Sequence, residues 1–202
     1  MNIKNIFIDF GGVLVRTEDK LPRTRAAAKI NLSVRDLEKV IFGSESGLRA
    51  SLGEIPEEAH WQEVANALRL KRDKADEITK EFFAGDRVDV TWLNALRKQR
   101  PEHKVALISN AWSGLRAFIT QEGFADVFDH MIISAEVGIM KPDPRIYLLA
   151  LEELNAKGDE SVFIDDMMAN VEGACSVGMK GIHFTEPDRA LQELQYLLNE
   201  HR

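Results

Sequence analysis

The chain has 202 residues, of which 45% are hydrophobic and 29% are charged, and it carries a net charge of −7. This length and apolar content suffice for one domain, or for one domain that carries an insertion. The acidic balance, without any Lys/Arg cluster, argues against a nucleic-acid partner, and no apolar run approaches the ~18 residues that a membrane span requires.

The start of the chain and its cysteine content both bear on its location. Residues 3–10 read "IKNIFIDF", an apolar run that is too short for a signal peptide and in which charged residues come too early. Cys175 is the only cysteine, so no intramolecular disulfide can form, which fits a reducing compartment. We therefore expect a cytoplasmic protein, and we expect Cys175 in the core because it lies on an Ala/Val-rich helical face.

The first predicted strand, "KNIFID" at residues 4–9, is followed by a long segment with helical patterns. Residues 16–86 contain no clear strand, and Ser33 with Asp36 forms a capping box ahead of one of the helical patterns. This segment is too long for a crossover connection and too ordered for a loop. We interpret residues 16–86 as a helical cap inserted into a core of residues 1–15 and 87–202.

Four more β-branched or aromatic runs follow, with helical patterns around them. Their near-continuous apolarity is typical of strands buried on both faces, as in a parallel sheet. The alternation of strands and helices predicts an α/β sheet covered on both faces. The predicted strands are 104–109, 130–134, 162–166 and 181–184, and the predicted helices are 89–99, 113–124, 144–156, 167–179 and 187–201.

Polar side chains stand at the ends of three of these strands. Asp9 ends the first strand, Ser109 the second, and the pair Asp165–Asp166 the fourth. Ligands bind outside the carboxyl ends of the strands in open parallel sheets, so the three acids would converge and repel one another unless a cation joined them. Carboxylates plus water, sharing oxygens with a phosphate, describe a Mg²⁺ site.

Other side chains near these strand ends suit a phosphate. Lys141, in the loop "GIMKPDP" at 138–144, could supply positive charge, while Ser109 and Asn110 could donate hydrogen bonds to phosphate oxygens. Each has a structural alternative, because strand-terminal Asp and Ser residues often serve only as turn or cap residues, and Lys141 could be a solvated loop lysine. Their joint occurrence favours a functional site.

Four segments, in order along the chain, resemble the haloacid dehalogenase superfamily of hydrolases. They are "DFGGVL" at 9–14, "ISNA" at 108–111, "GIMKPDPRIY" at 138–147 and "VFIDDMMANVEGA" at 162–174. The resemblance implies a Rossmann-like three-layer core with a small α-helical cap. It also implies the spatial strand order 181–184, 162–166, 4–9, 104–109, 130–134.

The same resemblance implies a Mg²⁺-dependent phosphoric monoester hydrolase that acts on a small phosphorylated molecule through an aspartyl-phosphate intermediate. Asp9 would be the nucleophile and a metal ligand, together with the Gly11 carbonyl. Asp166 would be a direct acidic ligand, and Asp165 would act through water. Ser109 and Lys141 would hold the phosphoryl group, and Lys141 would keep Asp9 ionised.

Gly11 departs from the usual pattern of the family's phosphatases, which have a second Asp at this position as general acid and base. Such a group typically contributes ~10²–10⁴-fold to the rate. The chain is most similar to a subgroup with an Asp-x-Gly first motif, which includes bacterial α-glucose-1-phosphate phosphatases, so a sugar phosphate is one candidate substrate. Glu18 and Asp19, in the predicted cap, are candidate proton donors.

Two other functions stay open at this point. A 2-haloacid dehalogenase would use Asp9 to attack a carbon atom and would need no metal, and a phosphatase-like protein would only bind a ligand or a partner. The adjacent acids of "FIDD" at 163–166 favour a cation site over the dehalogenase, and the intact Asp9 and Lys141 favour an enzyme. His60 and Trp61 could close over a substrate or form a core-and-surface pair. Nothing in the sequence indicates the oligomeric state.

Overall fold

A computed structural model describes residues 2–199, and its centre is a parallel sheet of five strands. The strands lie in the spatial order β5–β4–β1–β6–β7, and every neighbouring pair is parallel. The α/β fold and this order confirm the prediction. The bounds are β1 (Asn5–Ile8), β4 (Lys104–Ser109), β5 (His130–Ile133), β6 (Ser161–Asp165) and β7 (Lys180–His183).

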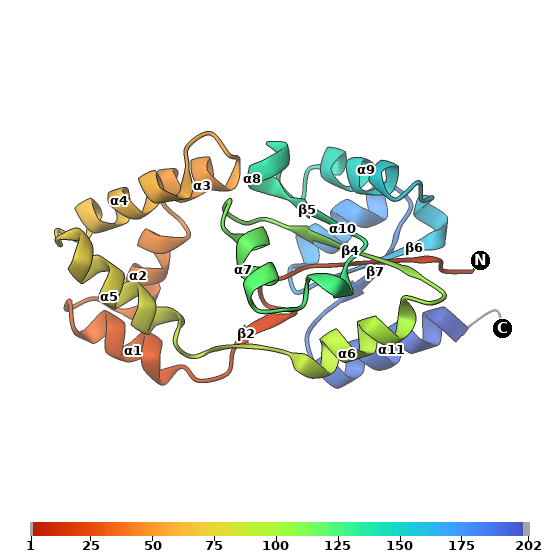
Figure 1. Cartoon of the computed structure of the whole chain (residues 1–202), viewed down its shortest axis with the longest axis horizontal. Helices are drawn as coiled ribbons and strands as arrows, with labels where there is room; N and C mark the ends of the chain where they lie inside the picture. Colours follow the sequence, from red (N-terminus) through yellow and green to blue (C-terminus); the bar gives the residue numbers. More distant parts are fainter. Residues whose placement is uncertain (1, 200–202) are drawn as a thin grey trace.

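Helices cover both faces of the sheet, which makes three layers (Figure 1). The alternation of side chains along β1 shows why, because Ile6 and Ile8 enter one apolar cluster and Phe7 enters the other. The first cluster lies under α6 (Val90–Gln99), α7 (Leu115–Gln121) and α11 (Pro187–Asn199). The second lies under α9 (Pro144–Glu153) and α10 (Met168–Ser176).

Short elements at the ends of strands and helices were harder to foresee. The 3₁₀ turns η1 (Ala125–Val127) and η2 (Gly158–Glu160) and the single turn α8 (Ser134–Val137) are too brief to leave a periodic pattern.

Cys175 is exposed on α10, so its predicted place in the core is wrong. No helix within residues 2–199 has the length and apolarity to cross a bilayer, and the cytoplasmic location stays a prediction.

Five helices between β1 and α6 form a separate lobe at the end of the molecule opposite both termini (Figure 1). They pack around their own apolar cluster, which includes Leu37, Ile41, Val64, Ile78 and Phe82. Helix α2 begins as the capping box predicts, because Ser33 Oγ accepts a hydrogen bond from the Asp36 amide at 3.1 Å. The helices are α1 (Leu21–Ala28), α2 (Val34–Ile41), α3 (Glu45–Ser51), α4 (Glu57–Ala67) and α5 (Arg72–Phe83).

A two-stranded antiparallel ribbon, β2 (Val15–Thr17) with β3 (Asp86–Val88), connects this lobe to the core. The Thr17 hydroxyl donates to Asp86 at 2.6 Å, and Arg23 of α1 also contacts that carboxylate at 3.2 Å. The sequence did not predict this ribbon, because strands of three partly charged residues carry no alternating pattern. The predicted cap boundaries at residues 16 and 86 fall inside the ribbon.

Candidate active site

Three carboxylates meet at the carboxyl end of the sheet. Asp9 follows β1 directly, Asp165 is the last residue of β6, and Asp166 comes next. The two strands are paired with Ile8 beside Ile164, and the Asp9 amide donates to the Ile164 carbonyl at 2.9 Å. One oxygen from each of the three carboxylates lies within 4.8 Å of the others. The parallel register therefore produces the convergence that the strand ends predict.

Lys141 inserts between two of these acids. Its Nζ lies 2.8 Å from Asp9 Oδ1 and 2.6 Å from Asp165 Oδ2, and its side chain is 1% exposed. When all the groups are ionised, the site holds three negative charges against this one positive charge. A buried excess of charge is costly unless another cation compensates it. A bound divalent cation would therefore balance the charge of the site.

Asp165 is held tightly by the protein itself. Its Oδ1 accepts from the Met167 amide at 2.8 Å, and Asn170 Nδ2 lies 3.0 and 3.1 Å from its two oxygens. The Tyr147 hydroxyl donates to the Asn170 carbonyl at 2.8 Å and so fixes the start of α10. Both oxygens of Asp165 are occupied, which suits a supporting position. Asn170 is buried and faces the acids.

Asp166, by contrast, is exposed and approaches the loop after β1 closely. A Cβ on Gly12 would lie 2.3 Å from Asp166 Oδ2, and Gly12 has φ of +81°. Both the left-handed backbone and the close approach require glycine at position 12. Any larger side chain there would displace the Asp166 carboxylate from the cluster.

Gly11 has neither constraint. No heavy atom lies within 4 Å of the position that its Cβ would occupy, and its φ lies outside the left-handed region. The space in which a side chain at position 11 would project is therefore open. Of the two candidate proton donors, Asp19 accepts from the Leu21 amide at 2.9 Å at the start of α1, and Glu18 lies 4.0 Å from Arg16. Their predicted role as proton donors stays a prediction.

Ser109 and Asn110 stand at the end of β4, the neighbour of β1. Ser109 is buried, and its predicted contact with a phosphate stays a prediction. The Asn110 side chain has a different partner, because its Nδ2 donates to the Lys141 carbonyl at 2.9 Å and its Oδ1 accepts from the Lys141 amide at 2.8 Å. Asn110 thus holds the backbone of the lysine loop, a role that the sequence analysis missed.

The environment raises the pKa of two of the carboxyl groups. Burial raises the pKa of Asp9 from 3.8 to about 6, and the nearby Asp165 adds to the rise while Lys141 opposes it. Burial, followed by the charge of Asp165, also raises the pKa of Asp166. Both shifts have the same physical origin, which is negative charge confined in a partly desolvated space.

His60 and Trp61 lie in the helical lobe rather than among the acids. His60 is fully buried, and its Nδ1 lies 2.9 Å from the Ser46 hydroxyl. His60 is therefore a core residue, as in the core-and-surface alternative. Trp61 is partly exposed, and its Nε1 donates to Glu57 at 3.0 Å.

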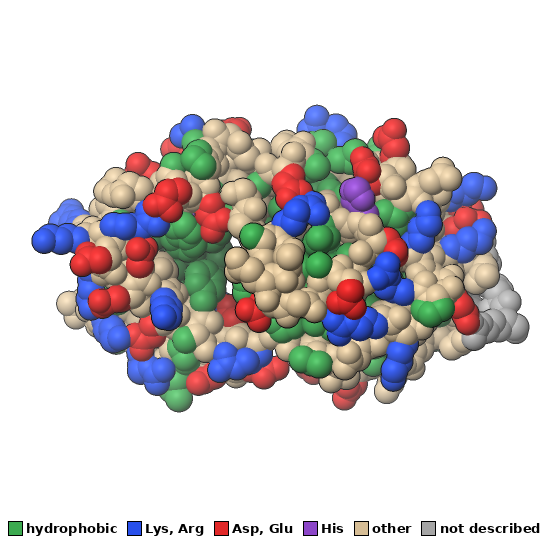
Figure 2. Space-filling view, in the orientation of Figure 1, with side chains coloured by type: hydrophobic (Ala, Val, Ile, Leu, Met, Phe, Trp, Pro, Cys, Tyr) green, Lys and Arg blue, Asp and Glu red, His purple; other side chains and the backbone are tan. Residues whose placement is uncertain are grey.

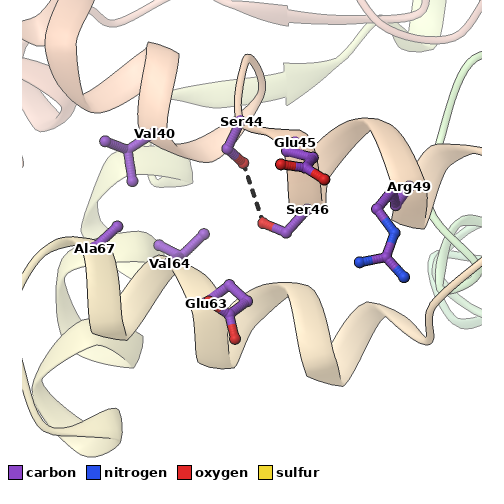
Figure 3. Close-up of a pocket in the computed structure, with 8 residues that line it drawn as sticks. All are labelled: Val40, Ser44, Glu45, Ser46, Arg49, Glu63, Val64 and Ala67. Atoms are coloured by element: carbon purple, nitrogen blue, oxygen red, sulfur yellow. Dashed lines mark hydrogen bonds between the residues drawn. The ribbon is translucent and has the colours of Figure 1, made fainter.

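A hollow of about 310 Å³ lies inside the helical lobe, between the end of α2, α3 and α4 (Figure 3). Ser44 and Ser46 are hydrogen-bonded to each other there, at 3.2 Å. The hollow is lined by Val40, Ser44, Glu45, Ser46, Arg49, Glu63, Val64 and Ala67. None of these residues belongs to the strand ends, so this hollow is separate from the acidic cluster.

Comparison with known proteins relates the chain to one family. The model of the haloacid dehalogenase-like hydrolases matches residues 3–178. Among curated relatives, the D-ribitol-5-phosphate phosphatase of Bacteroides thetaiotaomicron is 26% identical over 98% of this chain and 99% of that protein. The mouse acyl-CoA dehydrogenase family member 10 is 28% identical over 96% of this chain, which spans only 19% of the length of the mouse protein.

Among solved structures, a haloacid dehalogenase-family enzyme from Bacteroides thetaiotaomicron in complex with magnesium and inorganic phosphate superposes with a TM-score of 0.76. The two chains are 22% identical, and the match covers 91% of this chain and 95% of the other. At this level of identity the likeness concerns the fold.

The charge balance of the site makes a prediction about stability. The raised pKa of Asp9 means that the folded state binds its proton more strongly than the unfolded state does, so ionisation of Asp9 lowers stability as pH rises from about 4 through about 6, and the loss is complete above that range. In metal-free buffer at pH 7.5 we expect Asp9→Asn to unfold at a temperature roughly 2–8 °C higher than the wild type, for a gain of about 1–2 kcal/mol.

The gain should shrink at pH 4.5, where the Asp9 carboxyl is mostly protonated in the folded protein. Differential scanning calorimetry at both pH values measures it, with Asp159→Asn as a control because Asp159 is an exposed carboxylate of η2. A lower melting temperature for Asp9→Asn than for the wild type at pH 7.5 would contradict this account of the charges.

Proposed function

The chain belongs to the haloacid dehalogenase-like hydrolases, and from that premise we propose that it hydrolyses a small phosphate monoester with Mg²⁺ as cofactor. Asp9 is the proposed nucleophile, and the lobe of residues 16–86 is the proposed cap over the strand ends. A sugar phosphate is the substrate class that the sequence resemblance favours.

One observation carries this proposal, namely three converging carboxylates with a single lysine among them. The donor set consists of oxygens, which is the chemistry that Mg²⁺ prefers. Asp165 is already occupied by Lys141 and Asn170, so we assign the direct contacts to Asp9, Asp166 and the Gly11 carbonyl. Bound there, Mg²⁺ would neutralise charge on the phosphoryl oxygens.

The protein's own groups fit an attack by Asp9 on phosphorus. Asp9 Oδ1 is engaged by the Phe10 amide at 2.7 Å and by Lys141, whereas Oδ2 accepts no hydrogen bond from the described residues. The Oδ2–P bond forms as the P–O bond to the alcohol breaks, and Lys141 and Ser109 hold the phosphoryl oxygens in place. Water then attacks phosphorus, which releases inorganic phosphate and restores the Asp9 carboxylate.

The same nucleophile would serve a 2-haloacid dehalogenase, so the fold alone does not choose between the two activities. The exposed Asp166 argues for the phosphatase, because an acid beside Asp9 opposes the approach of a carboxylate substrate unless a cation lies between them. A protein that only binds ligands would have no need of a buried Asp9–Lys141 pair at this cost. The phosphatase and the magnesium complex among the related proteins lend further support.

The direct test is a panel of phosphate monoesters assayed with Mg²⁺ and with EDTA, beside a halide-release assay on 2-chloropropionate. We expect phosphate release that requires Mg²⁺ and falls by at least about 10³-fold in Asp9→Asn, because the variant lacks the attacking oxygen. Halide release without metal would assign the dehalogenase instead. Turnover of phosphate esters that survives in Asp9→Asn would contradict the covalent mechanism.

Gly11 predicts how the rate depends on the leaving group. Without an acid at position 11, the departing oxygen carries much of the charge in the transition state, so kcat should fall as the alcohol becomes more basic. Because the space at Gly11 is open, Gly11→Asp should fold normally and reduce this dependence, with a gain of about tenfold or more on alkyl phosphates.

The measurement is kcat for esters of graded leaving-group pKa, in the wild type, Gly11→Asp and the matched Gly11→Asn, which adds similar volume without a proton donor. A flat dependence in the wild type would show that another group already donates the proton. Glu18→Gln and Asp19→Asn would then identify it, as the variant in which the dependence becomes steep.

A further inference from the structure

Four aromatic side chains join the cap helices to the loop after β4, and we call them the aromatic wall: Phe42, Trp61, Phe83 and Trp112. Trp112 stacks on Phe42, with ring centres 5.9 Å apart and planes at 16°. Trp61 meets Trp112 edge-on at 5.0 Å, and Phe83 meets Phe42 edge-on at 5.9 Å. Each ring therefore contacts at least one other.

The aromatic wall is only partly covered by the protein. Phe42 is 48% exposed, and the other three rings are partly buried. Figure 2 shows hydrophobic side chains lining the hollow between the helical lobe and the core. Large apolar groups left open beside a cleft usually mark a binding surface.

One ring of the wall follows a strand end of the candidate site along the chain. Trp112 comes three residues after Ser109, at the carboxyl end of β4. On the core side, Met167 and Met168 directly follow Asp166 and are 59% and 47% exposed. Exposed apolar side chains thus follow the acids on the core, and we expect the alcohol part of a phosphate ester bound at the strand ends to project between them and the wall.

The polar atoms of the wall are already paired within the protein. Trp112 Nε1 donates to the Gly47 carbonyl at 3.2 Å, and Trp61 Nε1 donates to Glu57 Oε1 at 3.0 Å. The second oxygen of Glu57 accepts from the Gly114 amide at 2.8 Å. The wall therefore presents ring faces and edges, and none of its indole N–H groups is free for a substrate hydroxyl.

We propose that the aromatic wall binds the alcohol part of the substrate, and that this alcohol is apolar, an extended or aromatic hydrocarbon rather than a polyol. The proposal rests on the phosphatase function above and replaces the sugar phosphate with an apolar ester as the preferred substrate. A polyol would leave hydroxyls unpaired against the rings, which costs binding energy. An apolar chain gains by burying surface against them.

The test uses ethyl, butyl and octyl phosphate, whose leaving groups are all primary alcohols of similar basicity, and ribitol 5-phosphate as the polyol. We expect kcat/KM to rise about three- to fourfold for each methylene that the wall covers, and ribitol 5-phosphate to fall below octyl phosphate. Binding of ethyl- and octylphosphonate, which are not hydrolysed, should show the same order by calorimetry.

Two substitutions at one position separate apolar contact from structure. Phe42→Gln should flatten the chain-length dependence of kcat/KM and of phosphonate binding, and cost octyl phosphate about tenfold, whereas Phe42→Leu should keep most of it. Leu148→Gln is the matched control, since Leu148 is 52% exposed on α9, away from the wall, and should leave the dependence intact.

A flat series in the active wild-type enzyme, or a preference for ribitol 5-phosphate, would overturn the proposal and leave the phosphatase function standing. If no ester is hydrolysed, the phosphatase function fails, and the phosphonate series alone decides whether the wall binds apolar chains. Self-association that is lost in Phe42→Gln by sedimentation, with an unchanged chain-length dependence, would assign the wall to contact between copies and overturn the proposal.

Discussion

The site depends on negative charge held together at one edge of the sheet, where Asp9, Asp165 and Asp166 face a single lysine. The register of β1 and β6 brings the acids together, and glycine at position 12 allows Asp166 to approach. The pKa of Asp9 rises to about 6 because its carboxylate is buried and lies close to the negative charge of Asp165. The clustered acids lower the stability of the fold, and they suit the binding of a cation and a phosphoryl group.

Two asparagines keep this arrangement in place without taking part in the charge balance. Asn110 binds the backbone of Lys141 through both ends of its amide, and Asn170 contacts both oxygens of Asp165. Lys141 is thereby held between two acids at hydrogen-bond distance. The helical lobe contributes differently, because its aromatic rings contact Trp112 in the loop after β4, where Phe42 stacks on that ring.

The sheet could be predicted from the sequence because its strands are near-continuous apolar runs, and those of the central strands β1, β4 and β6 are buried almost throughout. Its polar strand ends likewise indicated which acids would meet. The ribbon of β2 and β3 left no such pattern in three residues each, and the exposure of Cys175 depends on how α10 sits against β7, which local composition does not encode. Of the two glycines after Asp9, only Gly12 has a Cβ position blocked by Asp166; at Gly11 the space is open. That difference depends on tertiary contacts.

We infer that the three acids create a site for one divalent cation, with Asp166 as a direct ligand. Titration calorimetry of Mg²⁺ into the wild type and Asp166→Asn tests it, with Asp159→Asn as a control of equal charge change. We expect one Mg²⁺ site in the wild type and the control, and a loss of affinity of about tenfold or more in Asp166→Asn. Equal Mg²⁺ affinity in all three proteins, or no binding by the wild type, would contradict it.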